Sequence, residues 1–129
     1  MPTHADTLRT LYAAFAAGDI PTVLGALAPD VQWTEAEGFP YGGLHVGPNA
    51  VLENVFMKIG ADWTSYTAQP AEFLECGDTV VVLGEYRGAH RASGKSFKAP
   101  FAHVWRFAGG KIAAFQLYAD TVLVQRAMG

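Results

Sequence analysis

Three ionisable side chains of this sequence lie in segments that otherwise have the apolar pattern of a protein core. His103 and Asp120 lie on the two arms of one hairpin, KAPFAHVWRFAGGKIAAFQLYADT, and Glu35 ends a short strand-like segment that contains Trp33. A neutral imidazole donates one hydrogen bond and accepts another, so it can polarise a carbonyl or pass a proton. A carboxylate that aromatic neighbours desolvate has a raised pKa, as a general acid or base near neutral pH requires. We therefore take His103, Asp120 and Glu35 as candidate catalytic residues.

His103 is expected to point inward from its strand. Strand alternation places Phe101, His103 and Trp105 on one face and Val104 and Arg106 on the other. On a face shared with aromatic rings, the imidazole suits either of two roles. It is a catalytic group at the wall of a cavity, or it is a structural histidine whose hydrogen bonds are satisfied by a neighbouring polar side chain.

Asp120 also has two interpretations. The alternation groups it with Gln116 and Tyr118 on one face, which suits a polar patch in the lining of a cavity. In a tight hairpin, Asp120 lies too far along the chain to join His103 without a bulge or a long side-chain reach. Alternatively, DTVLVQRAM forms a terminal helical turn, and Asp120 caps it.

Glu35 shares a predicted strand face with Val31 and Trp33, so an inward carboxylate fits the pattern. The alternative places Glu35 at the frayed end of the strand, in solvent beside Glu37, because glutamates are usually exposed.

Aromatic residues supply the predicted lining of a substrate pocket. Each of them alone is typical of a core, but as a set with few buried charges they favour an apolar ligand that has one or two polar groups. The predicted pocket residues are Trp33, Tyr41, Trp63, Tyr86, Phe101, Trp105 and Tyr118.

Composition and motifs exclude several other kinds of chemistry. The 129 residues carry a net charge of −3 without a basic cluster, which argues against nucleic acid and anionic membranes as partners. The single cysteine, Cys76, excludes an internal disulfide, and no histidine pair has metal-ligand spacing. The sequence has no glycine-rich phosphate loop and no nucleophile elbow. We expect no metal, no cofactor, no membrane span, and one cytoplasmic domain over residues 1–129.

The elements that must position these side chains can be read from periodicity. Leu8, Leu11, Tyr12 and Phe15 recur at helical spacing behind a capping-box sequence, and two further helices are predicted near residues 19–28 and 48–60. Alternating segments then predict strands over 31–35, 63–75, 79–88, 96–107 and 111–119. Three helices followed by an antiparallel meander indicate an α+β domain.

Four segments in this order resemble one known family. LYAAFAAGDIPTVLGALAPDVQW, a GP before the third helix, GDTVVVLGEYRG and HVWRFAGGKIAAFQLYADT are similar to the SnoaL-like branch of the NTF2-like superfamily, which includes polyketide cyclase-like and ketosteroid isomerase-related proteins. The resemblance runs from about Asp6 to Met128. It implies a cone in which three N-terminal helices pack on a curved, mostly antiparallel sheet around a pocket, but it does not specify one reaction.

The resemblance also assigns positions to individual residues. Glu35 falls where ketosteroid isomerases keep the carboxylate that moves the proton, and His103 falls where they keep the carboxylic acid of the oxyanion hole. Leu11 matches the position of their oxyanion tyrosine, with Tyr12 one residue away. Asp120 falls near the aspartate that SnoaL-type cyclases use as acid and base, so the cyclase branch fits better than the isomerase branch.

Two functions from different classes follow. The first is a cofactor-independent enzyme of the polyketide cyclase or isomerase kind, in which Asp120 or Glu35 removes a proton next to the carbonyl of a small apolar or aromatic substrate and His103, with Tyr118, stabilises the enolate. The second is a non-catalytic module that binds a small molecule or forms dimers. Epoxide hydrolysis needs an inward arginine, and Arg106 faces outward. We expect a homodimer, because one face of the sheet is neither covered by helices nor strongly polar.

Overall fold

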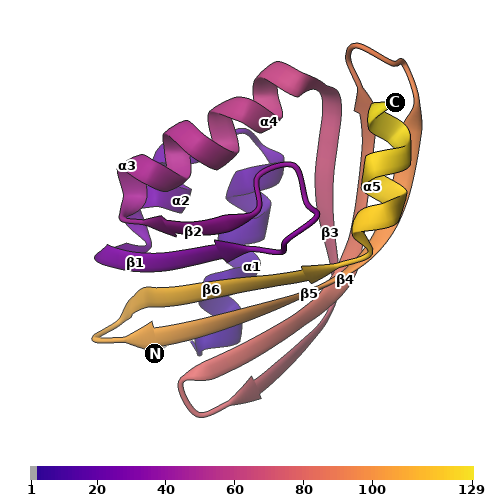
Figure 1. Ribbon diagram of the computed structural model, residues 1–129. Helices are drawn as coiled ribbons and strands as arrows, with labels where there is room; N and C mark the ends of the chain where they lie inside the picture. The colour runs from indigo at the N-terminus through magenta and orange to yellow at the C-terminus, as the bar shows by residue number, and fades with distance from the viewer. Residues whose placement is uncertain (1–2) are drawn as a thin grey trace.

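The computed structural model of the chain describes residues 3–129 and contains one mixed sheet with helices on it (Figure 1). Its elements are, in chain order, α1 (His4–Ala16), α2 (Ile20–Gly25), β1 (Leu27–Glu35), β2 (Gly43–Val46), α3 (Pro48–Val51), the π-helical turn η1 (Leu52–Phe56), α4 (Met57–Asp62), β3 (Trp63–Cys76), β4 (Thr79–His90), β5 (Ser96–Ala108), β6 (Lys111–Ala119) and α5 (Thr121–Met128). The predicted α+β class and the three N-terminal helices are confirmed, since α3, η1 and α4 run on as one helical segment.

The sheet has the strand order β2-β1-β6-β5-β4-β3. Only β1 and β6 pair in parallel, and every other neighbouring pair of described strands is antiparallel. Strand β2 is absent from the predicted strands, because its four residues, GLHV, are too few to show a clear alternation. Strand β1 begins at Leu27, earlier than predicted.

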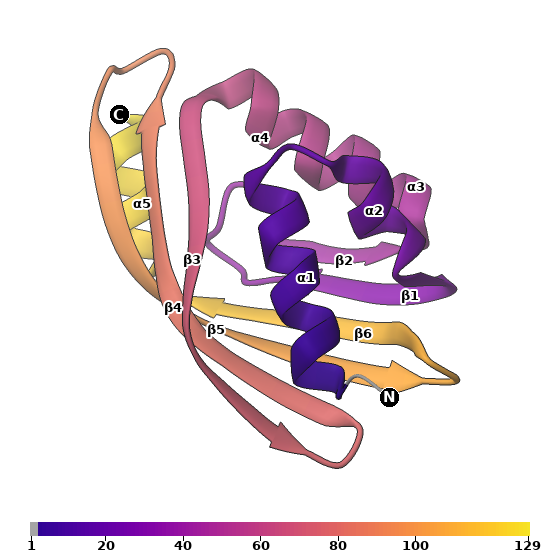
Figure 2. The same cartoon turned by 180° about the vertical axis from the view of Figure 1, so that it is seen from behind.

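The long strands β3, β4 and β5 bend so that the sheet wraps around α1, which crosses it in Figure 2. Gly84 of β4 allows the close packing at the bend, because a Cβ there would lie 2.3 Å from the Gln69 carbonyl oxygen and 2.6 Å from Cζ of Phe101. The pairing of β3 with β4 is irregular at Pro70/Glu72, opposite this glycine. We call the face of the sheet that α1 covers the inner face.

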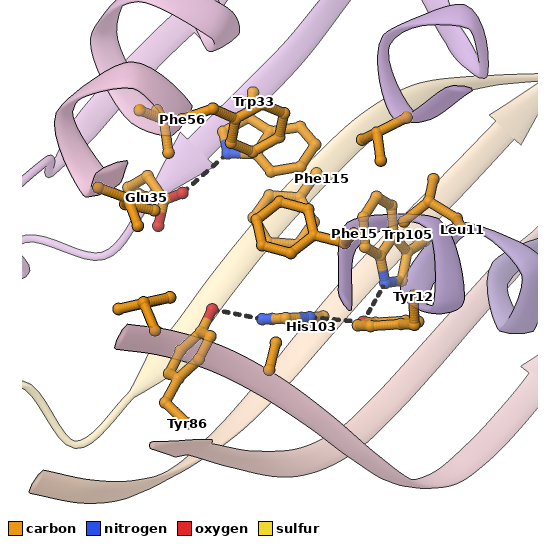
Figure 3. Close-up of a pocket in the computed structure, with 15 residues that line it drawn as sticks. Leu11, Tyr12, Phe15, Trp33, Glu35, Phe56, Tyr86, His103, Trp105 and Phe115 are labelled. Atoms are coloured by element: carbon orange, nitrogen blue, oxygen red, sulfur yellow. Dashed lines mark hydrogen bonds between the residues drawn. The ribbon is translucent and has the colours of Figure 1, made fainter. Parts of the chain in front are cut away.

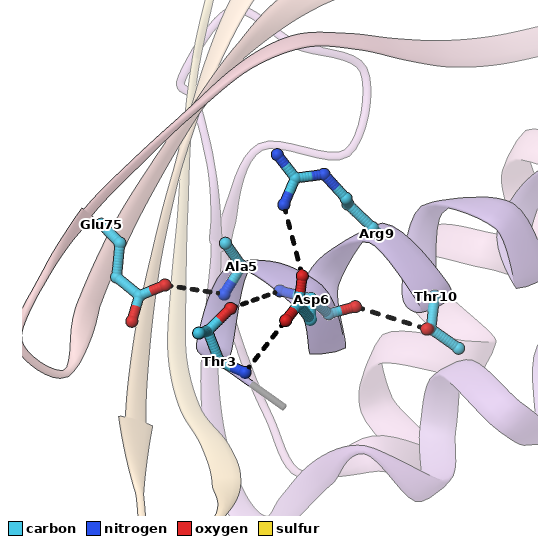
Figure 4. Close-up of polar contacts among 6 residues, drawn as sticks. All are labelled: Thr3, Ala5, Asp6, Arg9, Thr10 and Glu75. Carbon is cyan, nitrogen blue, oxygen red and sulfur yellow. Dashed lines mark hydrogen bonds and ion pairs between the residues drawn. The ribbon is translucent and has the colours of Figure 1, made fainter. Parts of the chain in front are cut away.

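Helix α1 begins with the capping box that its sequence predicts (Figure 4). The Asp6 amide donates to Oγ1 of Thr3 at 3.1 Å, and the Thr3 amide donates to Oδ2 of Asp6 at 3.2 Å. These hydrogen bonds from Thr3 lower the pKa of Asp6. The Ala5 amide donates to the Glu75 carboxylate of β3 at 3.0 Å, which ties the start of the helix to the sheet.

Strand β5 alternates as predicted. Phe97, Ala99, Phe101, His103, Trp105 and Phe107 are buried on the inner face. His103 and Trp105 contact Tyr12 of α1, and Phe107 stacks on His4 at the start of the same helix, so His103 lies among aromatic rings beneath α1. Helix α5 packs against β4 and β5 at the other end of the molecule. None of the helices within residues 3–129 is long and apolar enough to cross a membrane.

Candidate functional site

A cavity of about 40 Å³ lies between the inner face of the sheet and the helices α1 and α3–α4 (Figure 3). That volume holds only a few water molecules. Most of the wall is hydrocarbon or aromatic ring, and the polar groups come from Tyr12, Glu35, Tyr66, Tyr86 and His103. The remaining lining residues are Leu11, Phe15, Val23, Trp33, Val55, Phe56, Ile59, Ala68, Trp105 and Phe115.

His103 is held between two tyrosine hydroxyl groups. Oη of Tyr12 lies 2.5 Å from Nδ1, and Oη of Tyr86 lies 2.6 Å from Nε2. The ring stacks on Phe101 with centroids 3.9 Å apart. Burial lowers the pKa of His103 to about 3, so the imidazole is neutral at physiological pH. It can therefore accept and donate one hydrogen bond each, but it does not act as a cation there.

Tyr12 and Tyr86 are themselves neutral and buried. Desolvation raises the pKa of each phenol above its ordinary value. The indole Nε1 of Trp105 donates to Oη of Tyr12 at 3.0 Å, which extends the hydrogen-bonded chain to four side chains. This chain runs from the α1 side of the cavity to its β4 side, as the dashed lines of Figure 3 show.

Glu35 is the buried carboxyl group of the cavity. Glu35 and Trp33 lie two residues apart in β1, so both side chains point to the inner face. Nε1 of Trp33 donates to Oε1 of Glu35 at 2.8 Å. The second oxygen, Oε2, is buried without a hydrogen-bond partner among the described residues. Burial raises the pKa of Glu35 to about 7, against which the Trp33 hydrogen bond acts only in part. A carboxyl group with such a pKa can both take up and release a proton near neutral pH.

The structure brings five of the predicted site residues to the cavity wall. These are Glu35, His103, Trp33, Tyr86 and Trp105. Phe101 lies next to the site rather than in its wall, since its ring covers one face of the His103 imidazole.

Tyr41 and Trp63 do not line the cavity, contrary to the prediction. Both are buried, but they form a separate cluster with Asp62. Oη of Tyr41 accepts from Nε1 of Trp63 at 3.1 Å and donates to Oδ2 of Asp62 at 2.7 Å. Their polar atoms are thus satisfied by each other, at the junction of α4 and β3.

Asp120 and Tyr118 lie outside the cavity, which corrects the prediction that they share it with His103. Asp120 is exposed at the N-cap position of α5, as in the alternative interpretation, although its side chain makes no capping hydrogen bond. Tyr118 is 58% exposed on the outer face of β6. The residue of β6 that pairs with His103 is Leu117, and the side chain of Leu117, not that of Tyr118, points inward.

Tyr118 and Asp120 lie outside the cavity because the β5–β6 hairpin contains a bulge. The register shifts by one residue between the pairs Arg106↔Ala114 and Phe107↔Ile112. A regular ladder continued from the turn would place Gln116 opposite His103 and would turn the polar residues of β6 inward. Because side chains alternate with a period of two, a single extra residue exchanges the two faces of the strand.

The sequence patterns did not place Tyr12 or Tyr66 in the site, although the family resemblance put Tyr12 one residue from the position of an oxyanion tyrosine. Tyr12 fits the helical repeat of apolar residues in α1, so its pattern indicates only core packing. Its hydroxyl contact with His103 joins residues 91 positions apart, and no local pattern reports such a contact. Within residues 3–129, no group of three or more histidine, cysteine, aspartate or glutamate side chains is placed to hold a metal ion.

Comparison with known proteins identifies relatives along nearly the whole chain. The family model of the SnoaL-like domain matches residues 8–115. An NTF2-like protein from Burkholderia thailandensis is 38% identical with a TM-score of 0.96, covering 100% of this chain and 99% of that one. An NTF2-like protein of unknown function from Burkholderia pseudomallei is 35% identical with a TM-score of 0.91, covering 99% of this chain and 98% of that one.

A third similar structure is TerC, which was co-crystallised with polyporic acid. It is 28% identical with a TM-score of 0.87, covering 96% of each chain. No curated protein matches this chain.

Proposed function

Because the chain belongs to the SnoaL-like domain family, we propose that it is an acid–base enzyme that moves a proton next to the carbonyl group of a small apolar compound without the help of a cofactor. The observation that carries this proposal is the state of Glu35. Among the described residues, its Oε2 atom is buried at the cavity without a hydrogen-bond partner, and the pKa of the side chain is raised to about 7. Native proteins seldom leave a buried polar atom unpaired unless a ligand, a proton or a reaction uses it.

The proposed reaction uses Glu35 as the base. The carboxylate takes a proton from the carbon next to the substrate carbonyl, and negative charge moves onto the carbonyl oxygen. The hydroxyl group of Tyr86 beside His103 is a neutral donor in a site with little water, where hydrogen bonds to a developing oxyanion are strongest. Glu35 then returns the proton to another carbon of the substrate, which completes an isomerisation. In a ring closure, the enolate carbon first attacks a second carbonyl carbon of the same substrate, and Glu35 gives the proton to the oxygen of that opened C=O bond.

The comparisons support a small organic ligand but not a particular one. TerC was co-crystallised with polyporic acid, and its chain is 28% identical to this one. The cavity of about 40 Å³ limits the ligand. Any compound of more than a few heavy atoms enters only when side chains such as Phe15 of α1 or Phe56 of η1 move.

The test follows exchange of carbon-bound hydrogen in small ketones and diketones dissolved in heavy water. We expect wild-type protein to speed this exchange, with a rate that rises with pH through about 7, because only ionised Glu35 removes a proton. Glu35→Gln keeps the size and the acceptor for Trp33 but is expected to lower the rate by about 100-fold or more, in line with the loss of a general base.

Asp120→Asn is the matched control for the carboxylate, since Asp120 lies outside the cavity. It is expected to leave the exchange rate unchanged. Equal rates for wild type and Glu35→Gln, measured on folded protein, would rule out Glu35 as the base.

A second candidate function is a binding module for a small apolar molecule. The predominance of hydrocarbon and aromatic groups in the wall of the cavity favours it. Saturable binding of a ketone by wild-type protein without any hydrogen exchange would support this candidate over the enzyme.

A further inference from the structure

The hydrogen-bonded chain through His103 has a direction, which the donors and acceptors of its four groups determine. The indole nitrogen of Trp105 carries a hydrogen and only donates, so Oη of Tyr12 accepts at that end. The neutral imidazole of His103 has one N–H and one bare nitrogen. Each tyrosine has a single proton to donate. Two arrangements remain, and they differ in which ring nitrogen carries the hydrogen.

In the first arrangement, Nδ1 of His103 carries the hydrogen and donates to Oη of Tyr12. That oxygen then accepts twice, from Trp105 and from His103, and the Tyr12 proton must find another acceptor. Among the described residues, Tyr12 has no hydroxyl contacts besides these two. A buried hydroxyl proton without an acceptor costs about 1–3 kcal/mol, so this arrangement is disfavoured.

In the second arrangement, every proton of the chain has a neighbour that can accept it. Trp105 donates to Tyr12, Tyr12 donates to Nδ1 of His103, and Nε2–H donates to Oη of Tyr86. The proton of Tyr86 then points away from His103, and the hydroxyl of Tyr66 can accept it, whereas the Tyr12 proton of the first arrangement has no such neighbour among the described residues. Tyr86 and Tyr66 both line the cavity, so a ligand oxygen can take the place of Tyr66 as the acceptor.

We infer that the Trp105–Tyr12 pair holds His103 as its Nε2–H tautomer, and that Tyr86 thereby presents its hydroxyl proton to the cavity as the donor for a ligand oxygen. Successive hydrogen bonds polarise one another, so Tyr86 is a better donor than an isolated phenol. Trp105, Tyr12 and His103 are positioning residues in this scheme, and Tyr86 is the one that touches the ligand. The ligand half of the inference rests on the proposed function, whereas the tautomer does not.

The first test is nitrogen NMR of protein labelled in its histidine rings, at neutral pH and without ligand. We expect one protonated and one bare nitrogen for His103, with the hydrogen on Nε2. In Trp105→Phe the indole no longer polarises the Tyr12 hydroxyl, so Tyr12 becomes a weaker donor to Nδ1 and a better acceptor from it, and a share of the Nδ1–H tautomer is expected beside the Nε2–H form. An Nδ1–H tautomer or a doubly protonated ring in the wild type would overturn the inference, as would an unchanged single tautomer in Trp105→Phe.

The second test uses p-fluorophenol, a small mimic of an enolate, followed by fluorine NMR. We expect saturable binding by the wild type, and about tenfold weaker binding by Tyr86→Phe, the loss of one hydrogen bond. Tyr118→Phe removes an exposed hydroxyl outside the cavity and is expected to bind as the wild type does. Unchanged affinity in Tyr86→Phe, or no saturable binding by the wild type, would overturn the ligand half.

The outcomes separate this inference from the proposed function. An Nε2–H tautomer together with Tyr86-dependent phenol binding, in a protein that exchanges no ketone hydrogen, would support the inference and contradict the enzyme. Should Tyr86→Phe fail to fold by thermal melting, the wild-type and Trp105→Phe tautomers still decide the direction of the chain.

Discussion

At the scale of single residues, the same cause moves the two ionisable groups of the cavity in opposite directions. Burial disfavours charge, so it raises the pKa of Glu35 to about 7 and lowers the pKa of His103 to about 3. Both groups are therefore largely neutral in the folded protein in mildly acidic solution. Proton transfer at this site then depends on Glu35 alone, because His103 stays neutral over the range in which Glu35 titrates.

These pKa values predict how stability depends on pH. Glu35 has an ordinary pKa of 4.5 in the unfolded chain and about 7 when folded, so the folded state holds its proton more tightly. The protonated Glu35 therefore contributes a stabilisation of the folded state that is complete below the unfolded pKa of 4.5 and is lost as pH rises through about 7. The difference corresponds to about 3 kcal/mol. Urea unfolding is expected to show that the stability of wild type relative to Glu35→Gln falls by about this amount between pH 4.5 and pH 7. Parallel curves would contradict the raised pKa.

His103 acts at the other end of the pH scale. Its folded pKa of about 3 lies below the ordinary value of 6.5, so the unfolded chain binds the proton more tightly. Stability is expected to fall as pH drops from 6.5 toward 3, because the unfolded state gains a proton that the folded state excludes. Between 4.5 and 6.5 the contributions of Glu35 and His103 have opposite slopes and largely cancel. The effect of Glu35 is therefore clearest when the difference in unfolding free energy between wild type and Glu35→Gln is plotted against pH.

At the scale of elements, one-residue details of the strands decide what the site contains. The bulge in the β5–β6 hairpin turns Leu117 rather than Gln116 toward His103. Gly84 has a comparable role in β4, since the absence of a side chain lets Phe101 cross the strand. The ring of Phe101 in turn supports the imidazole of His103.

Two glycine-to-alanine changes test this packing. Gly84→Ala forces a Cβ to within 2.6 Å of the Phe101 ring and closer still to the Gln69 carbonyl oxygen. We expect it to destabilise the protein by about 3 kcal/mol, at the upper end of the cost of overpacking. Gly60→Ala, the control, adds a Cβ to helix α4 with no atom within 4 Å. It is expected to stabilise by about 0.5–1 kcal/mol. Similar unfolding free energies for the two variants would contradict the close approach at Gly84.

At the scale of the whole molecule, the helices leave part of the outer face of the sheet open. Thr34, Val104 and Gln116 are partly exposed there, and Tyr118 is 58% exposed. A shallow hollow runs between them across β1, β6 and β5. We propose that two copies of the chain pair through this face, because an exposed aromatic side chain on a weakly charged sheet is better buried.

The dimer is tested by light scattering on size-exclusion chromatography. We expect twice the mass of the chain for wild type, and the mass of a single chain for Tyr118→Glu, because a charge in a buried interface is costly. Met57→Glu places the same charge on an exposed apolar residue of α4 and is expected to leave the dimer intact. A monomeric wild type would refute the proposal, and so would a Tyr118→Glu variant that still dimerises.

The sequence by itself determined the class of fold and identified five of the fifteen residues that line the cavity. Alternation predicts β3 to β6 to within two residues of their ends, because each strand buries one face and exposes the other. The same alternation correctly predicts that the side chains of Glu35, Trp33, His103 and Trp105 point inward. The segment order also indicates the SnoaL-like family that the comparison confirms.

Only the tertiary structure decided which groups meet. The bulge in the β5–β6 hairpin changes the register by one residue, and as a result Tyr118 and Asp120 lie outside the site. The alternation of apolar and polar residues does not reveal where such a bulge occurs. The contact of Tyr12 with His103 depends on how α1 crosses the sheet, not on either local sequence. Periodicity tells which face a side chain takes within its element, whereas the partner across the cavity depends on how separate elements pack.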